Sequence, residues 1–204
     1  MKDLLLILTG YALGSMPWGY WLPRILRGVN IRKVGSGSTG AANVWRTLGF
    51  KIGLGVALLD IAKGFAAALL GLWLGGEFVG LLAGIAAMVG HWRPLFIGFS
   101  RGGKIVATTG GVALALVPLA TLAAAAVWVC AFLATRYTSV ASMVSATTLP
   151  LFALLFGASW PVVAFTAGAA VAIFVLHRAN IARLLSRSEN RFELRRASKA
   201  RGGA

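Results

Sequence analysis

The residues whose types suit chemistry gather in three hydrophilic segments that separate long apolar runs. The first segment, residues 31–46, reads IRKVGSGSTGAANVWR, with glycines interleaved with hydroxyl side chains and flanked by basic residues. Glycines let backbone N–H groups converge on an anion, hydroxyls add further donors, and basic side chains add charge. The segment is not a Walker loop, because no Gly-Lys-Ser/Thr closes it. The pattern indicates a phosphate-binding loop, with a flexible connector as the simpler alternative.

The second segment, residues 90–104, ends in a Gly-Gly pair followed by Lys104. An apolar run begins at the next residue, so Lys104 lies near the start of an expected helix. The helix dipole disfavours a cation there unless an anion lies nearby. Lys104 is therefore a candidate phosphate ligand. The alternative is an ordinary basic residue that flanks a membrane span.

The third segment begins at His177, which ends the last apolar run, and Asn180 follows three residues later. This spacing places both side chains on one face of a continued helix. His177 is a candidate general base, although an isolated histidine at the end of an apolar run is more often simply interfacial. Ser139 and Ser142 have the same spacing in another run, where hydroxyls usually serve helix packing.

One ionisable pair, Asp60 and Lys63, lies inside an apolar run. Charged groups inside a membrane normally face the protein interior and pair with each other. Their i,i+3 spacing brings the two side chains together on a helix. A local salt bridge is therefore the expected structure.

Composition requires lipid as the solvent for much of the surface. Of the 204 residues, 58% are hydrophobic and only 12% are charged, whereas soluble domains carry about a quarter charged residues. The net charge of +15 suits anionic lipid or a phosphorylated substrate. Nucleic acid is not expected, because the chain shows no recognisable binding module. With two histidines and one cysteine, neither a metal site nor a cofactor is expected.

Seven apolar runs predict an all-α polytopic membrane protein with seven transmembrane helices. They lie at about residues 4–23, 52–75, 78–92, 105–117, 119–135, 139–156 and 160–176. The first run is expected to be a retained span rather than a signal peptide. Residues 105–135 would measure about 46 Å as one helix, which is too long for one span. Two passes, broken near Pro118, place nearly all basic residues on one side of the membrane.

The positive-inside rule then places the N-terminus outside and the C-terminus in the cytoplasm. The cytoplasmic loops 24–51 and 93–104 carry the first two chemical segments on one face. Residues 1–185 form a single seven-helix transmembrane domain in this prediction, and residues 186–204 form a basic cytoplasmic tail. The tail is expected to lie on anionic membrane lipid.

Several short motifs resemble those of the bacterial acyl-phosphate:glycerol-3-phosphate acyltransferases, the PlsY family. The motifs are GSMPWG at 14–19, RKVGSGSTGAAN at 32–43, RTLG at 46–49, LDIAKG at 59–64, GH at 90–91, GGK at 102–104 with AT at 107–108, and HRANI at 177–181 with EN at 189–190. The resemblance implies transfer of a fatty acyl group from acyl phosphate to the 1-hydroxyl of glycerol 3-phosphate. The products are lysophosphatidic acid and phosphate, in phospholipid biosynthesis at the bacterial cell (inner) membrane. The resemblance implies no particular protein partner.

The resemblance also implies roles for individual residues. The catalytic candidates are His177 as the base, with Ser36 and Asn180 as orienting groups; a substrate phosphate oxygen is the alternative base. The candidate ligands of substrate phosphate are Arg46, Lys104, Ser142, Gly35, Gly37, Ser38, Thr39, Gly40 and Asn43. The chain departs from the family pattern most clearly at Ile105, where glycine is common. A β-branched residue stiffens the turn beside Lys104.

Two other functions remain open at this level. A small-anion transporter or channel would explain the helices and the cations, but it should place polar residues through to both faces, often with internal repeats. A structural membrane protein would need no Gly/His/Lys segments on a common face. The crowding of polar residues on one side favours the acyltransferase.

Overall fold

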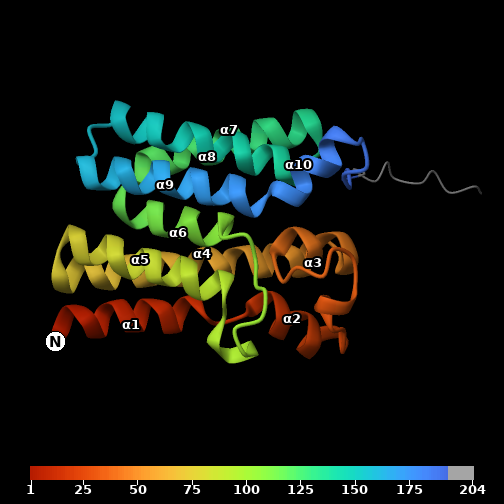
Figure 1. Cartoon of the computed structure of the whole chain (residues 1–204), viewed down its shortest axis with the longest axis horizontal. Coiled ribbons are helices and arrows are strands. Elements are labelled where there is room, and N and C mark those ends of the chain that lie inside the picture. Colours follow the sequence, from red (N-terminus) through yellow and green to blue (C-terminus); the bar gives the residue numbers. More distant parts are fainter. Residues whose placement is uncertain (193–204) are drawn as a thin grey trace, which may run out of the picture.

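The structure is a computed structural model that describes residues 1–192, and every regular element in that part of the chain is helical. The elements are α1 (Lys2–Gly14), α2 (Trp18–Arg27), η1 (Ile31–Lys33), α3 (Ala41–Leu48), α4 (Phe50–Gly75), α5 (Glu77–Trp92), η2 (Leu95–Ile97), α6 (Val106–Leu116), α7 (Pro118–Thr135), α8 (Thr138–Leu155), α9 (Trp160–Leu176) and α10 (Arg178–Leu185). The long helices run side by side along one axis, with α1 to α6 in one half and α7 to α10 in the other (Figure 1).

Small residues allow the helices of the first half to approach closely. Gly10 and Gly14 of α1 face Ala83 and Ala87 of α5, and a β-carbon added at Gly14 would lie 2.0 Å from the Ala87 carbonyl oxygen. This small-xxx-small packing is typical of helices that associate in lipid, where hydrophobic burial supplies little driving force. It fixes α5, which leads directly into the second hydrophilic segment.

The first apolar run, residues 4–23, is predicted as a single span, but it does not form one continuous helix. It breaks between Gly14 and Trp18 into α1 and α2. Pro17 lies at this break and explains it. Proline lacks a donor for the helical ladder and disfavours helical geometry at the residue before it. The expected break near Pro118 is confirmed, since α6 ends at Leu116 and Pro118 starts α7.

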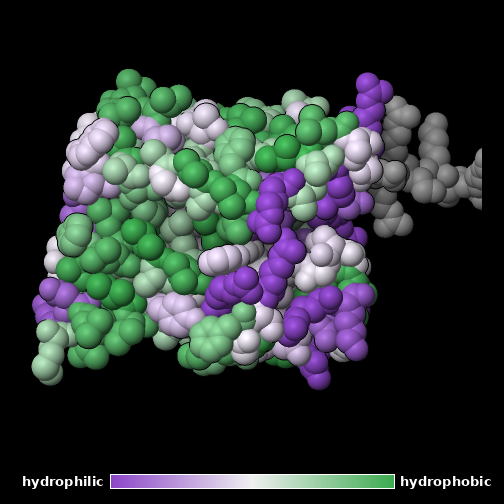
Figure 2. Space-filling view, in the orientation of Figure 1, coloured by the Kyte–Doolittle hydropathy of each residue, from purple (hydrophilic) through white to green (hydrophobic). Residues whose placement is uncertain are grey.

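Four stretches are long and apolar enough to cross a membrane: α4, Glu77–Ile97, α7 and α8. A fifth is obtained if α9 and α10, which meet at an angle of 57°, count as one broken span. Among the shorter apolar helices, α6 has 11 residues, or about 16 Å of rise. Hydrophobic residues cover much of the flank of the molecule, as a lipid-facing surface requires (Figure 2).

The hydrophilic segments meet at one end of the bundle, which we call the loop end. It carries α2, α3, residues 93–104 and α10, and hydrophilic side chains gather there (Figures 1 and 2). Residues 186–192 of the predicted tail contact the helical body, where Phe192 is buried and its backbone N–H donates to the Arg136 carbonyl over 2.9 Å. The remainder of that tail, residues 193–204, lies outside the described part of the chain.

Candidate active site

The first hydrophilic segment folds around the side chain of Asn43. The Asn43 Oδ1 atom accepts from the Ser36 backbone N–H over 2.9 Å, while Nδ2 donates to the carbonyls of Ser38 (2.9 Å) and Val34 (3.2 Å). A β-carbon at Gly35, whose φ is 59°, would lie 2.3 Å from Asn43 Oδ1. The amide of Asn43 is therefore occupied by the loop itself. Asn43 shapes the loop, and the exposed Ser36 hydroxyl is carried on the turn that it holds.

The rest of this loop connects it to its neighbours. The Gly40 N–H donates to Ser38 Oγ over 3.2 Å. Thr39 is buried, and its carbonyl lies so close to Gly19 of α2 that no larger residue fits at position 19. On the other side, a β-carbon at Gly40 would lie 4.0 Å from the Gly103 Cα. The first two hydrophilic segments are thus adjacent.

The second segment delivers Lys104 to the start of α6. The backbone N–H of Gly102 donates to the Trp92 carbonyl over 2.9 Å, which closes the turn back onto the end of α5. The half-buried Lys104 donates its Nζ to Asn180 Oδ1 in the other half of the molecule. This hydrogen bond joins the second and third segments, 76 residues apart.

Asn180 belongs to a network centred on Glu189. Glu189 Oε1 accepts from Asn180 Nδ2 (2.6 Å) and from Ser139 Oγ (2.9 Å), and Oε2 pairs with Arg183 Nε at 2.7 Å. Burial acts to raise the pKa of Glu189, but the hydrogen bonds from Asn180, Arg183 and Ser139 outweigh it and hold that pKa below its usual value. The carboxylate stays ionised and fixes the orientation of the Asn180 amide.

His177 lies at the bend between α9 and α10 and is buried. Its Nδ1 is 2.8 Å from the Ile173 carbonyl oxygen. A carbonyl can only accept, so this contact assigns the proton to Nδ1 and leaves the lone pair on Nε2 in the neutral ring. The backbone carbonyl of His177 accepts from the Asn180 N–H over 2.7 Å. One turn of chain therefore carries both a potential base and the partner of Lys104.

Positive charge exceeds negative charge at this site. Arg46, Lys104 and Arg183 are close enough to perturb one another, and Glu189 is the carboxylate that acts on them within residues 1–192. Burial lowers the pKa of Lys104 to about 8, with Glu189 acting to raise it and Arg183 and Arg46 to lower it further. Burial also lowers the pKa of Arg46. The cluster is suited to a doubly charged phosphate, which would balance the surplus charge.

The family model described as Glycerol-3-phosphate acyltransferase matches residues 4–187. The chain belongs to this family. A glycerol-3-phosphate acyltransferase of Desulforudis audaxviator is 45% identical over 193 residues, which covers 95% of this chain and 97% of that protein. One from a Synechococcus strain is 43% identical over 94% of each chain.

Two solved structures of the integral membrane glycerol 3-phosphate acyltransferase PlsY (YgiH) share the fold. The glycerol 3-phosphate form has a TM-score of 0.90 at 39% identity, covering 95% of this chain and 96% of that one. The lysophosphatidic acid form has a TM-score of 0.88 at 38% identity. This acyltransferase is accordingly an all-α, multi-pass integral membrane protein.

Two of the predicted site residues, Ser142 and Asn43, have side chains that are hydrogen-bonded within the protein. Ser142 Oγ donates to the Thr138 carbonyl over 2.7 Å and accepts from Trp128 Nε1 over 3.2 Å, so its hydroxyl serves helix packing in this state. Asn43 is occupied by its loop, as described above. Lys104, Asn180 and His177 are brought together, with Arg46 within electrostatic range of Lys104.

Sequence reasoning did not single out Glu189, Arg183 and Ser139 as site residues. Glu189 offered the clearest signal, because it is one of two acidic residues in a basic stretch and belongs to the EN motif of the resemblance. Its partner Ser139 is 50 residues away. Neither the position nor the spacing of Glu189 and Ser139 in the sequence predicts that their side chains are in contact.

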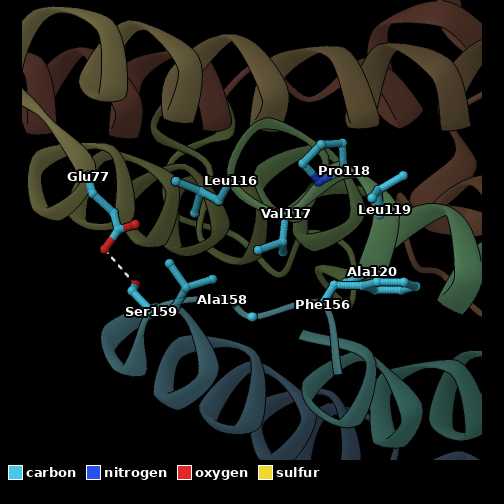
Figure 3. A pocket seen from close by; sticks show the side chains of 11 residues that line it. Glu77, Leu116, Val117, Pro118, Leu119, Ala120, Phe156, Ala158 and Ser159 are labelled. Atoms are coloured by element: carbon cyan, nitrogen blue, oxygen red, sulfur yellow. Dashed lines mark hydrogen bonds between the residues drawn. The ribbon is translucent and has the colours of Figure 1, made fainter. Parts of the chain in front are cut away.

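A cavity of about 310 Å³ is lined by Leu116 at the C-terminal end of α6 (Figure 3). Lys104 precedes the other end of this helix, which begins at Val106. The walls of the cavity come from the α6–α7 and α8–α9 junctions and from Glu77 of α5, whose Oε1 accepts from Ser159 Oγ over 2.6 Å. Apart from that hydrogen-bonded pair the lining is mainly apolar, from residues such as Leu116, Val117 and Phe156. It contains none of the cations of the loop end, so the convergence of polar groups, and not the cavity, marks the candidate active site.

Proposed function

We propose that this protein transfers a fatty acyl group from acyl phosphate to the 1-hydroxyl of glycerol 3-phosphate, giving lysophosphatidic acid and inorganic phosphate. The observation that carries the proposal is the surplus of cations around Lys104 and Asn180, directly beside His177. Family membership supports the acceptor and the reaction class. The family resemblance of the loops supports acyl phosphate as the donor.

In this mechanism the cations hold the phosphate of glycerol 3-phosphate. Lys104 and Arg46 bind its oxygens, and the glycine-rich turn at Ser36 faces the phosphate of the donor. Two dianionic substrates repel each other, so preformed positive charge contributes to binding both and to stabilising the charge that develops at the carbonyl. Asn180 is held by Glu189 and orients the Lys104 ammonium group.

The chemical step is a direct acyl transfer. The 1-hydroxyl oxygen attacks the acyl carbonyl carbon, the new C–O ester bond forms, and the bond between that carbon and the bridging phosphate oxygen breaks. The phosphate leaves with the electron pair. His177 Nε2 accepts the hydroxyl proton, because the Ile173 carbonyl holds the other ring nitrogen in its protonated form. Acyl phosphate is an activated mixed anhydride, so no covalent enzyme intermediate is required.

The competing assignment of the base is a phosphate oxygen of the substrate. His177→Gln removes the base while keeping a hydrogen-bonding side chain of similar length. If His177 is the base, single-turnover rates in this variant fall by about 100-fold or more. Turnover near that of the wild type would assign the proton to the substrate phosphate instead.

We further propose that the bundle crosses the membrane seven times, with the N-terminus outside and the loop end in the cytoplasm. In this arrangement residues 1–185 form one transmembrane domain, followed by the basic tail 186–204. The basic residues of the loop end support this orientation. In a Cys130→Ala background, membrane-impermeant maleimide should label Lys2→Cys on intact spheroplasts and Arg27→Cys only after lysis. The reverse pattern would overturn the orientation.

The activity is tested with purified protein in detergent, palmitoyl phosphate and glycerol 3-phosphate. The expected products are lysophosphatidic acid and phosphate in equal amounts. Replacing the donor with palmitoyl coenzyme A, or the acceptor with glycerol, should abolish product formation. A folded sample that yields no lysophosphatidic acid from the first pair would contradict the proposal, and equal use of coenzyme A thioester would contradict the donor assignment.

A further inference from the structure

Three ionisable side chains are buried together between α4 and α5, outside the site described above. Asp60, Lys63 and His91 are each at most 6% exposed. Lys63 Nζ lies 2.9 Å from Asp60 Oδ1, which confirms the pair expected from the sequence. His91 Nδ1 lies 3.4 Å from the same carboxylate oxygen. Ionisable groups are costly inside a membrane protein, so a cluster of three requires a structural or functional reason.

Lys63 is tied to the break in the first apolar run. Its Nζ donates to the Met16 carbonyl over 2.9 Å. This carbonyl lies just past the end of α1, where the helical ladder can no longer supply a donor. Lys63 therefore forms an ion pair with Asp60 and donates a hydrogen bond to the backbone at the α1–α2 break. The pair is locked in place between two helices and balances its own charge.

The His91 ring forms the floor under the Gly102–Gly103 turn. A β-carbon at Gly103 would lie 2.1 Å from His91 Nε2 and 2.7 Å from Cε1, so the backbone of the turn packs closely against the Nε2 end of the ring. The Gly103 N–H also donates to the His91 carbonyl over 3.3 Å. The next residue in the chain is Lys104, so the point at which the Gly-Gly turn meets His91 determines where Lys104 leaves the turn.

We propose that His91, held by Asp60 and Lys63, is a positioning residue that sets the place of Lys104 at the loop end. The Asp60 carboxylate orients the ring, as carboxylates orient histidines around metal sites. The ring supports Gly103, and the turn aims Lys104 at Asn180. The inference rests on the proposed role of Lys104 as a ligand of substrate phosphate. A displacement of about 1 Å in such a group can cost about 100-fold in rate.

A double-mutant cycle between Gly103→Ala and His91→Asn tests the contact. His91→Asn keeps a donor near Asp60 but removes the part of the ring beneath Gly103. Gly103→Ala should raise the KM for glycerol 3-phosphate at least about tenfold, because its methyl group overlaps the ring and displaces the turn. His91→Asn should also raise this KM, because the turn loses its floor. In the double variant the methyl group occupies the vacated space, so its KM should not exceed that of Gly103→Ala alone.

Independent effects would instead multiply in the double variant, and that result would overturn the proposal. The matched control is Leu81→Ala, which removes buried volume from the same helix ten residues from His91. It should lower the melting temperature and leave the KM for glycerol 3-phosphate unchanged. If Leu81→Ala raises this KM as much as His91→Asn does, the effect is general loss of packing and the proposal fails.

The ion pair is tested by Asp60→Asn, which keeps the shape of the side chain but not its charge. It should raise the same KM while the KM for the acyl donor stays within about twofold. Lys104→Met distinguishes failure of the proposed phosphate site from failure of the positioning role of His91. If Lys104→Met is fully active, the proposed phosphate site is wrong; if it is inactive while the His91 and Asp60 variants keep the wild-type KM, only the positioning inference is wrong.

Discussion

Two charged clusters in this protein differ in their balance of charge. Between α4 and α5, Lys63 is paired with Asp60, and its Nζ also donates to the Met16 backbone carbonyl. At the loop end, Lys104, Arg46 and Arg183 face Glu189 within the described part of the chain. The first cluster needs no ligand, whereas the second has positive charge that a phosphate would neutralise. Charge balance, rather than the mere presence of charge, distinguishes the structural cluster from the proposed binding site.

The largest expected effect distinguishes the two lysines directly. Lys104→Met should lower kcat/KM for glycerol 3-phosphate by at least about 100-fold, the scale of losing one preorganised group that stabilises transition-state charge. It should not reduce stability, because it removes a partly buried charge from a cationic cluster. Enzyme assays and thermal unfolding in the same detergent measure both quantities.

Lys63→Met should behave in the opposite sense for stability. It leaves the Asp60 carboxylate buried without its partner, which costs about 3–5 kcal/mol. A Lys63→Met protein as stable as the wild type would remove the distinction between the clusters. Equal stability losses in both lysine variants would do the same.

The pH dependence of the loop-end cluster provides the next prediction. A lysine is charged below its pKa, so Lys104 with a pKa of about 8 is charged at pH 7 and loses its charge as pH rises through 8. The value of kcat/KM for glycerol 3-phosphate should fall about tenfold for each pH unit above this point. Lys104→Arg should move the alkaline limb upward by more than one unit. An unchanged limb would show that another group titrates.

Phe192 connects the chain after α10 to the cationic cluster. Its ring lies 4.6 Å from that of Trp45 and 5.6 Å from that of Phe132, and the Arg46 guanidinium lies 5.3 Å above it. Phe192→Ala should lower kcat/KM a few-fold by loosening Arg46, and lower the melting temperature. Phe192→Leu keeps much of the burial but not the cation–π contact. Activity should therefore rank wild type above Leu and Leu above Ala; an identical kcat/KM in all three would separate Phe192 from the site.

Ile105 gives the smallest expected effect. Its φ of 60° is left-handed, a conformation that strains a β-branched residue by about 1–3 kcal/mol. However, its side chain is 4% exposed and packs in the core, which contributes about 1.5–3 kcal/mol. Ile105→Gly removes both terms, so the free energy of unfolding should change by at most about 2 kcal/mol. A larger loss would mean that burial outweighs the strain; a larger gain would mean the reverse.

The sequence predicted the features that depend on local spacing or on lipid as solvent. The apolar runs predicted the helices closely, and the i,i+3 spacing predicted the Asp60–Lys63 pair, because both follow from the period of the α-helix. Pro118 broke the 105–135 run where expected. The same reasoning was not applied to Pro17, although its ring has the same consequence for the first run.

The contacts that build the site could not be predicted from spacing. Glu189 reaches Ser139 across 50 residues, and Arg46 Nη1 lies 3.5 Å from the Asn190 carbonyl across 144. Such pairs depend on how the two halves of the bundle pack. The resemblance to a family identified Asn43 and Ser142 as polar residues of the site, but it did not show that their side chains are hydrogen-bonded within the protein.

The binding of glycerol 3-phosphate tests most directly whether surplus charge makes the loop end a phosphate site. Isothermal titration calorimetry in detergent can measure the Kd for the wild type and for Lys104→Met, with glycerol as the uncharged reference ligand. A charge-assisted hydrogen bond contributes about 1.5–3 kcal/mol, so the variant should bind at least about tenfold more weakly, and glycerol should not bind detectably to either protein. The same Kd for glycerol 3-phosphate in both proteins would contradict the account.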